Sequence, residues 1–169
     1  IACWGVAGGW VIVSGCADDN AYVWDGESGA MRRTLAGHAG IVWSVACAGV
    51  AGGWIIASAG WDETARLWDG ESGAARQTFE GHTGFVVAVA CVVVAGELRV
   101  VTGSFDKTAR VWGERGALLT LKHASGVVSV ACAVLLAIAV QRASGSSRAR
   151  RPRGSLASLA GTYMLFVTN

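Results

Sequence analysis

The sequence predicts an all-β fold made of repeated units, and three observations lead to this prediction. The chain repeats itself at a spacing of 44 residues, as Cys3, Cys47 and Cys91 illustrate. Short runs of strand-forming residues alternate with turns rich in Gly, Asp, Glu and Ser. Hydrophobic residues make up 53% of the 169 residues, whereas charged residues make up only 15%. Stacked sheets that are buried on both faces account for this composition.

The repeat is specific enough to decide the architecture. Segments 3–38 and 47–82 share 22 identities over 36 positions without a gap. Further residues recur at the same spacing, and they are Ser14, Ser58 and Thr102, then Asp18, Asp62 and Asp106, then Trp24, Trp68 and Trp112. A fixed period of this length is the signature of a repeat architecture.

Each unit contains four predicted strands. In the best-preserved unit they cover 41–47, 54–58, 64–68 and 75–79. The segments between them are rich in the residues that hairpin turns require. The Gly-rich GVAGG at 5–9 and 49–53 lacks the following GK[ST] of a phosphate-binding loop, so we expect it to form a hairpin turn. Four short strands in about 40–45 residues make one blade of a β-propeller.

The units divide the chain into a propeller part, 1–132, and a tail, 133–169. Three units cover about 1–35, 41–79 and 85–121, and a fourth begins at 123–132, where HASGVVSVAC aligns with HAGIVWSVAC. We therefore predict a β-propeller fragment with about three blades and a degenerate partial fourth. The tail is expected to be a degenerate or disordered basic segment, or sequence read through from non-coding DNA. Because propellers close with about four to eight blades and the chain begins with Ile1, we expect it to be a piece of a longer protein.

The units resemble WD repeats, a family whose marks are a GH dipeptide and a terminal WD. Gly37-His38 and Gly81-His82 match the first mark, and Trp24-Asp25 and Trp68-Asp69 match the second. The third unit departs from the pattern with Trp112-Gly113. The resemblance covers roughly 1–132. It implies a non-catalytic scaffold or adaptor for protein–protein interaction. The alternative is a regulatory or substrate-recruiting part of a larger enzyme, such as a kinase, an ATPase or a ubiquitin-ligase receptor.

The resemblance gives a structural role to side chains that otherwise suggest a Ser-His-Asp triad. In WD repeats a Trp indole bonds a Ser or Thr hydroxyl, the hydroxyl bonds a His, and the His bonds an Asp. The residues at these positions are His38, Ser58, Asp62 and Trp68, then His82, Thr102, Asp106 and Trp112, and in the first unit Ser14, Asp18 and Trp24. A catalytic nucleophile needs an exposed hydroxyl and an oxyanion hole. We therefore expect no catalytic residue.

Metal, cofactor and nucleic-acid binding are not expected either. His38, His82 and His123 lie in different units at equivalent positions, so they cannot converge within the ~2 Å bonds of a zinc site. Residues 1–132 carry nine Lys and Arg and twelve Asp and Glu, a net charge of 9 − 12 = −3, which is unlike the basic surface of a nucleic-acid-binding protein. Five arginines in the tail could contact phosphates or form a nuclear-localisation patch, but their surroundings no longer follow the repeat.

The resemblance also points to a partner-binding face. In the family, one end of the propeller, the top face, often binds partners through residues at three positions of each repeat. The residues at these positions are Ile41, Trp43, Trp61, Phe85, Val87 and Phe105. Aromatic residues dominate the energetics of interfaces, so we expect this end to bind a protein or peptide. The alternative is that some of these rings pack between blades.

Location and assembly follow from composition. The five cysteines form no CxxC pair, and an odd number argues against a disulfide framework. We expect an intracellular protein of the cytoplasm, with the nucleus as the alternative.

The uncharged stretch 124–140 is at the lower limit for a membrane-spanning helix, but 126–132 match a blade strand, so no membrane span is expected. An arc that is not closed would expose apolar blade faces and self-associate.

Overall fold

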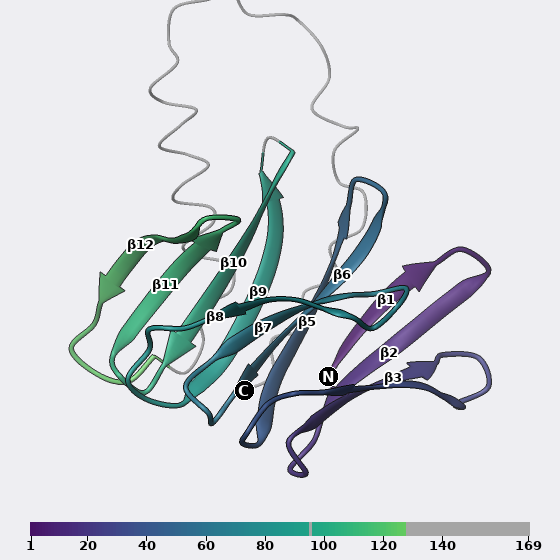
Figure 1. Cartoon of the computed structure of the whole chain (residues 1–169), viewed down its shortest axis with the longest axis horizontal. Helices are drawn as coiled ribbons and strands as arrows, with labels where there is room; N and C mark the ends of the chain where they lie inside the picture. The colour runs from purple at the N-terminus through teal and green to yellow at the C-terminus, as the bar shows by residue number, and fades with distance from the viewer. Residues whose placement is uncertain (95, 128–169) are drawn as a thin grey trace, which may run out of the picture.

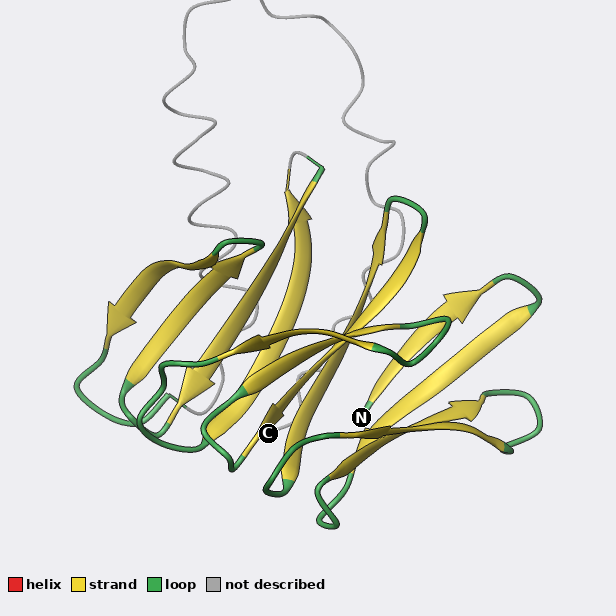
Figure 2. Ribbon diagram, viewed as in Figure 1, coloured by secondary structure: helices red, strands yellow, loops and turns green. Residues whose placement is uncertain are grey.

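A computed structural model describes residues 1–94 and 96–127, which consist of strands and loops (Figure 1, Figure 2). Blade 1 contains β1 (Ala2–Val6), β2 (Gly9–Gly15), β3 (Asn20–Asp25) and β4 (Met31–Ala36). Blade 2 contains β5 (Val42–Val50), β6 (Gly53–Gly60), β7 (Ala65–Asp69) and β8 (Ala75–Phe79). Blade 3 contains β9 (Val86–Val94), β10 (Glu97–Ser104), β11 (Thr108–Gly113) and β12 (Gly116–Lys122). Each blade is an antiparallel sheet whose strands follow chain order, so the predicted fold class is confirmed.

The first two strands of each blade form a long hairpin. In blade 2, Val50 pairs with Gly53, which leaves a two-residue turn of Ala51 and Gly52. Gly52 has a φ of 84°, a left-handed conformation that glycine adopts without a steric penalty. Blade 1 repeats this geometry, with Val6 paired to Gly9. The GVAGG segments are therefore hairpin turns, as predicted, and the tight turn lets both strands extend further than the sequence indicated.

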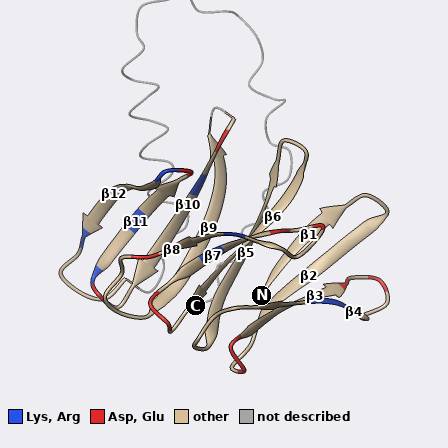
Figure 3. Cartoon of the chain, viewed as in Figure 1, with Lys and Arg blue, Asp and Glu red and all other residues tan. Residues whose placement is uncertain are grey.

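The three described blades lie side by side in an arc that does not close (Figure 1). Neighbouring blades contact each other through β5, the first strand of blade 2, which lies next to β2 of blade 1 and to β9 of blade 3. β5, β6 and β9 contain no charged residue, and the charged residues lie on other strands and in the turns (Figure 3). Strands β5, β6 and β9 are covered by neighbouring blades rather than by water. Their burial accounts for the high hydrophobic content of the chain.

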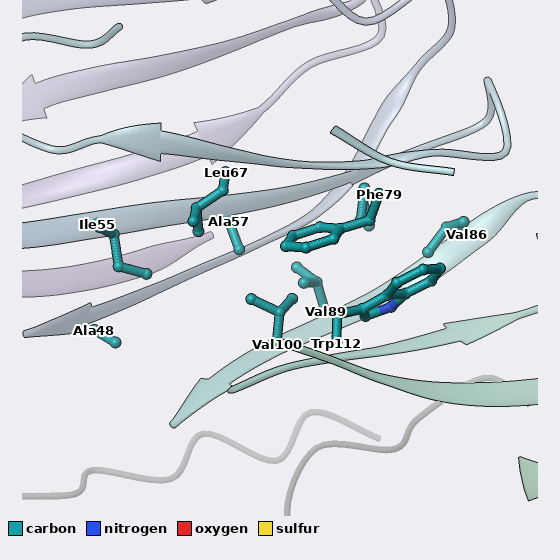
Figure 4. Close-up of a cluster of buried hydrophobic side chains, with 11 residues drawn as sticks. Ala48, Ile55, Ala57, Leu67, Phe79, Val86, Val89, Val100 and Trp112 are labelled. Carbon is teal, nitrogen blue, oxygen red and sulfur yellow. The ribbon is translucent and has the colours of Figure 1, made fainter. Parts of the chain in front are cut away.

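Apolar side chains fill the spaces between blades. Between blades 2 and 3, Ile55, Leu67 and Phe79 pack against Val100 and Trp112 (Figure 4). Between blades 1 and 2, the buried residues are Val11, Val13, Ala21, Val23, Leu35, Val42, Val45, Trp54, Ile56 and Trp68. Burying one such side chain contributes roughly 1.5–3 kcal/mol, so each blade depends on its neighbour for stability.

A tryptophan lies over the turn between the third and fourth strands of blades 1 and 2. In blade 2 the ring of Trp54 covers Gly70, where an added Cβ would lie 2.1 Å from the ring. The indole Nε1 of Trp54 donates to Glu71 Oε1 at 2.8 Å. Trp10 makes the same contacts with Gly26 and Glu27 in blade 1. Blade 3 has Leu98 at this repeat position.

The blades have two ends. One end, the top face, carries loops 37–41, 61–64, 80–85 and 105–107 and lies at the bottom of Figure 1. The other end, the hairpin end, carries the turns between first and second strands and between third and fourth strands. In the part of the chain that the structure describes, no helix is long and apolar enough to cross a membrane. The start of the fourth unit beyond 127, the tail 133–169 and most of the stretch 124–140 lie outside the described residues.

Candidate functional site

A chain of hydrogen bonds ties the top-face loops of blade 2 to its sheet. The indole Nε1 of Trp68 donates to Ser58 Oγ at 2.8 Å, and Ser58 Oγ lies 2.7 Å from His38 Nε2. His38 Nδ1 lies 2.9 Å from Asp62 Oδ2. Asp62 also accepts the backbone N–H of Ala39 at 3.1 Å. The loop that precedes β5 is thus joined to the turn between β6 and β7.

Blade 3 repeats this chain with threonine in place of serine. Trp112 Nε1 donates to Thr102 Oγ1 at 2.8 Å, and Thr102 Oγ1 lies 2.7 Å from His82 Nε2. His82 Nδ1 lies 2.7 Å from Asp106 Oδ2. In both blades the pairing register shifts beside the Trp, and an irregularity of this kind re-aims a side chain.

The partners of each histidine fix its protonation. A carboxylate can only accept, so Nδ1 of His38 carries the hydrogen and Nε2 accepts from the Ser58 hydroxyl. Burial lowers the pKa of His38 and His82 from the usual 6.5, although the neighbouring carboxylates act in the opposite direction. Burial alone would raise the pKa of Asp62, but hydrogen bonds from Ala39 and His38 outweigh it and lower that pKa. The pair is therefore a neutral imidazole bonded to a carboxylate.

Blade 1 has only part of this arrangement. Trp24 Nε1 donates to Ser14 Oγ at 2.9 Å, but within residues 1–94 and 96–127 no histidine bonds Ser14. Asp18 instead accepts the hydroxyl of Tyr22 at 2.6 Å. Among the described residues, no hydrogen bond joins Asp18 to Ser14 or Trp24.

Two threonines belong to the site and were not singled out from the sequence. Thr64 Oγ1 donates to Asp62 Oδ1 at 2.9 Å, and Thr108 Oγ1 donates to Asp106 Oδ1 at 2.7 Å. The signal that could have identified them is the repeated Asp-x-Thr, since Thr64 and Thr108 are also 44 residues apart.

The hydroxyls in these chains are closed to a substrate. Ser58 and Thr102 are both 0% exposed, and each is bonded on one side by an indole N–H. The arrangement can hold two loops in register, but it offers no surface at which a nucleophile would meet a carbonyl group.

Within residues 1–94 and 96–127, no three His, Cys, Asp or Glu side chains gather as metal ligands would.

Four aromatic rings form a continuous stack on the top face. The ring centroids of Trp43 and Trp61 are 5.6 Å apart, and those of Trp61 and Phe85 are 4.8 Å apart with planes at 8°. The Phe85 and Phe105 rings follow at 6.3 Å. We call these four side chains the aromatic stack. It crosses from blade 2 to blade 3 and brings together residues that are up to 62 positions apart in the chain.

Backbone geometry positions the aromatic stack. The N–H of Trp61 donates to the carbonyl of Ile41 at 3.0 Å, and that of Phe105 donates to the carbonyl of Phe85 at 3.0 Å. Trp43 has no partner in the pairing of β5 with β6, where the register skips from Val42 to Ser44. A bulge of this kind turns its side chain outward.

The six predicted contact residues differ in exposure. Trp43 is 57% exposed, Phe105 is 53% exposed and Phe85 is 40% exposed. Trp61 and Ile41 are half-buried. The shorter side chain of Val87 is only 5% exposed, so it offers little contact surface.

Four-stranded antiparallel blades, two of which carry a Trp–Ser/Thr–His–Asp hydrogen-bond chain, define a repeat protein of the propeller type. Two segments, 29–69 and 73–113, match the family model for the WD domain, G-beta repeat. The match is consistent with a WD-repeat family protein, and it confirms the resemblance seen in the sequence. WD40 repeats generally mediate protein–protein interaction by binding proteins or peptides, and they are typically non-catalytic scaffolds. A comparison with curated proteins finds no match.

The histidines predict a loss of stability in acid. Because His38 and His82 have lowered pKa values in the folded chain, the unfolded chain binds more protons once the pH falls below about 6.5. Stability is fully present above this pH and decreases as the pH falls toward the folded-state values, by at most about 1.4 kcal/mol per pH unit for each group. Urea unfolding at a series of pH values between about 8 and 5 measures the slope.

A variant separates the contributions of the two blades. His38→Gln removes one of the two buried imidazoles and should reduce the slope below pH 6.5 to about half. A urea midpoint that stays constant or rises as the pH falls would contradict the assignment of neutral, buried histidines.

Proposed function

We propose that the chain is a non-catalytic scaffold that binds a protein or peptide partner on its top face. The contact residues would be the aromatic stack, with Ile41 and Val87 at its margin. The observation that carries the proposal is the aromatic stack itself, since three of its four rings are at least 40% exposed. Monomeric proteins rarely leave large apolar side chains together in water unless they contact a partner.

The physical chemistry of the aromatic stack suits an interface. Rings that pack against each other have few accessible rotamers, so little conformational entropy is lost when a partner binds. Trp, Tyr and Arg side chains dominate binding energy at interfaces. The hydrogen-bond chains of blades 2 and 3 hold the loops from which Trp61 and Phe105 project. The aromatic stack is therefore preorganised for binding.

The test uses peptides selected against the full chain by display. The double variant Trp43→Ala/Phe105→Ala removes the two most exposed rings and leaves Trp61, whose half-buried ring supports its neighbours. We expect the selected peptides to bind this variant at least about 30-fold more weakly, since two hot-spot residues contribute about 2 kcal/mol or more. Calorimetric titration gives the two dissociation constants.

A matched control removes exposed apolar side chains from another surface. Leu118 and Leu119 of β12 are 55% and 41% exposed, and Leu118→Ala/Leu119→Ala should leave peptide affinity unchanged. If the two double variants bind the peptides equally well, or if selection yields no peptide, the top face is not the binding surface.

We also propose that the chain works inside the cell, in the cytoplasm. The support is chemical: Cys3, Cys16, Cys47 and Cys91 are all free thiols. Burial raises the pKa of Cys47 to about 12 and also raises that of Cys91, so both thiols remain protonated and unreactive. A fluorescent fusion that accumulates in the secretory pathway would contradict this location.

A further inference from the structure

A cavity of about 330 Å³ lies between blades 2 and 3 at the hairpin end. Blade 2 contributes Leu67, Gln77 and Phe79 to its walls, and blade 3 contributes Leu98, Val100 and Trp112. The proposed scaffold function does not use this space, because the aromatic stack lies at the opposite end of the same blades.

The repeat explains why a cavity occurs here. Trp10, Trp54 and Leu98 occupy the same repeat position, 44 residues apart. Between blades 1 and 2 the indole of Trp54 fills the corresponding space, where it is 6% exposed and packs with Leu35 and Ile56. Between blades 2 and 3 the smaller Leu98 stands in its place. The cavity therefore lies where blade 2 has an indole and blade 3 does not.

The turn beside this cavity is shorter in blade 3 than in blade 2. The register pairs Trp68 with Ala75 but Trp112 with Ala117. The connection is therefore two residues shorter in blade 3, with separations of 75 − 68 = 7 and 117 − 112 = 5 residues. In blade 2 this turn presents Glu71 to the indole N–H of Trp54 at 2.8 Å. In blade 3 the turn presents Glu114, which lines the cavity.

We propose that this cavity binds a free, small, planar aromatic molecule of the indole class. Its ring would take the position that a tryptophan side chain at residue 98 would fill, against Phe79 and Trp112. Its ring N–H would donate to the carboxylate of Glu114, as Trp54 donates to Glu71. The walls also include the polar side chains of Arg76 and Gln77. Ligand pockets span about 300–1,000 Å³, so the volume is sufficient for a bicyclic ring.

Indole itself is the probe, titrated into the full chain and followed by calorimetry and ligand-observed NMR. We expect one site with a dissociation constant of about 1 mM or tighter. Leu98→Trp should fill the cavity from within, weaken indole binding at least about tenfold and raise the unfolding temperature. Absence of indole binding to the wild-type chain, or unchanged binding to Leu98→Trp, would overturn the proposal.

The reciprocal variant gives an independent test. Trp54→Leu removes the indole between blades 1 and 2, beside Glu71, so the number of bound indole molecules should rise from about one to about two. A number that stays at one would show that the loss of an indole does not create such a site.

A second probe separates two sources of the ring. N-acetyltryptophanamide carries the same indole on a peptide backbone, and it should bind more weakly than indole because the backbone must also enter the cavity. Tighter binding by a factor of about ten or more would instead identify a tryptophan side chain of a polypeptide as the occupant and overturn the proposal of a free molecule.

Discussion

Ser58→Ala should lower the free energy of unfolding by about 2–5 kcal/mol. The hydroxyl of Ser58 is 0% exposed and serves two partners, Trp68 Nε1 and His38 Nε2. Its removal leaves a buried donor and a buried acceptor without a partner, and each such group costs about 1–3 kcal/mol. Urea unfolding of the full chain measures the difference.

Ser14→Ala is the matched control, because it makes the same change at the same repeat position in blade 1. Within the part of the chain that the structure describes, Trp24 is the one side-chain partner of Ser14, and the ring of Trp24 is partly open to water. We expect a loss of about 0.5–1.5 kcal/mol, the usual contribution of one hydrogen bond. Equal losses for the two variants would show that the hydrogen-bond chain of blade 2 has no special role in stability.

Phe79→Ala should cost about 3–5 kcal/mol, the range for removing a buried aromatic ring. Phe79 is 3% exposed, and its ring centroid lies 5.3 Å from that of Trp112 in the next blade. The change therefore weakens the contact between blades 2 and 3 as well as blade 2 itself. The measurement is again the urea midpoint, together with its slope.

Phe79→Leu provides the comparison, because blade 1 has Leu35 at the same repeat position, where it is 1% exposed. We expect a loss below about 1.5 kcal/mol, since the substitution keeps most of the apolar volume. If Phe79→Leu were as costly as Phe79→Ala, the contact between the aromatic rings of Phe79 and Trp112 rather than the burial of volume would be the main contribution.

Most of the fold could be predicted from the sequence because each blade is specified locally. Strand-forming runs such as 54–58 and 75–79 are bounded by glycines and acidic turn residues, which leaves few alternatives. The ends of the first strands were less predictable. β5 reaches Val50 rather than residue 47, because a two-residue turn lets pairing continue to the tip of the hairpin.

The candidate site was predictable in its members but not in its geometry. The repeat pattern points to His38, Ser58, Asp62 and Trp68 without any coordinates. By contrast, the contact between the rings of Trp61 and Phe85 depends on the distance between two blades, and the core packing between them sets that distance. The opposite exposures of Trp43 and Val87, which share a repeat position, are also not encoded in the pattern. The cavity beside Leu98 could have been suspected from the missing tryptophan.

The constant spacing of the blades has a consequence for the gene. Segments 3–38 and 47–82 are alike at 22 of 36 positions, so the gain or loss of one whole 44-residue unit would leave the repeat in register. Val42 and Val86 begin their blades at the same repeat position, 44 residues apart, and the join therefore falls at the same point of the structure each time. A lineage could change its number of blades in a single genetic step, with each new boundary already matched to its neighbour.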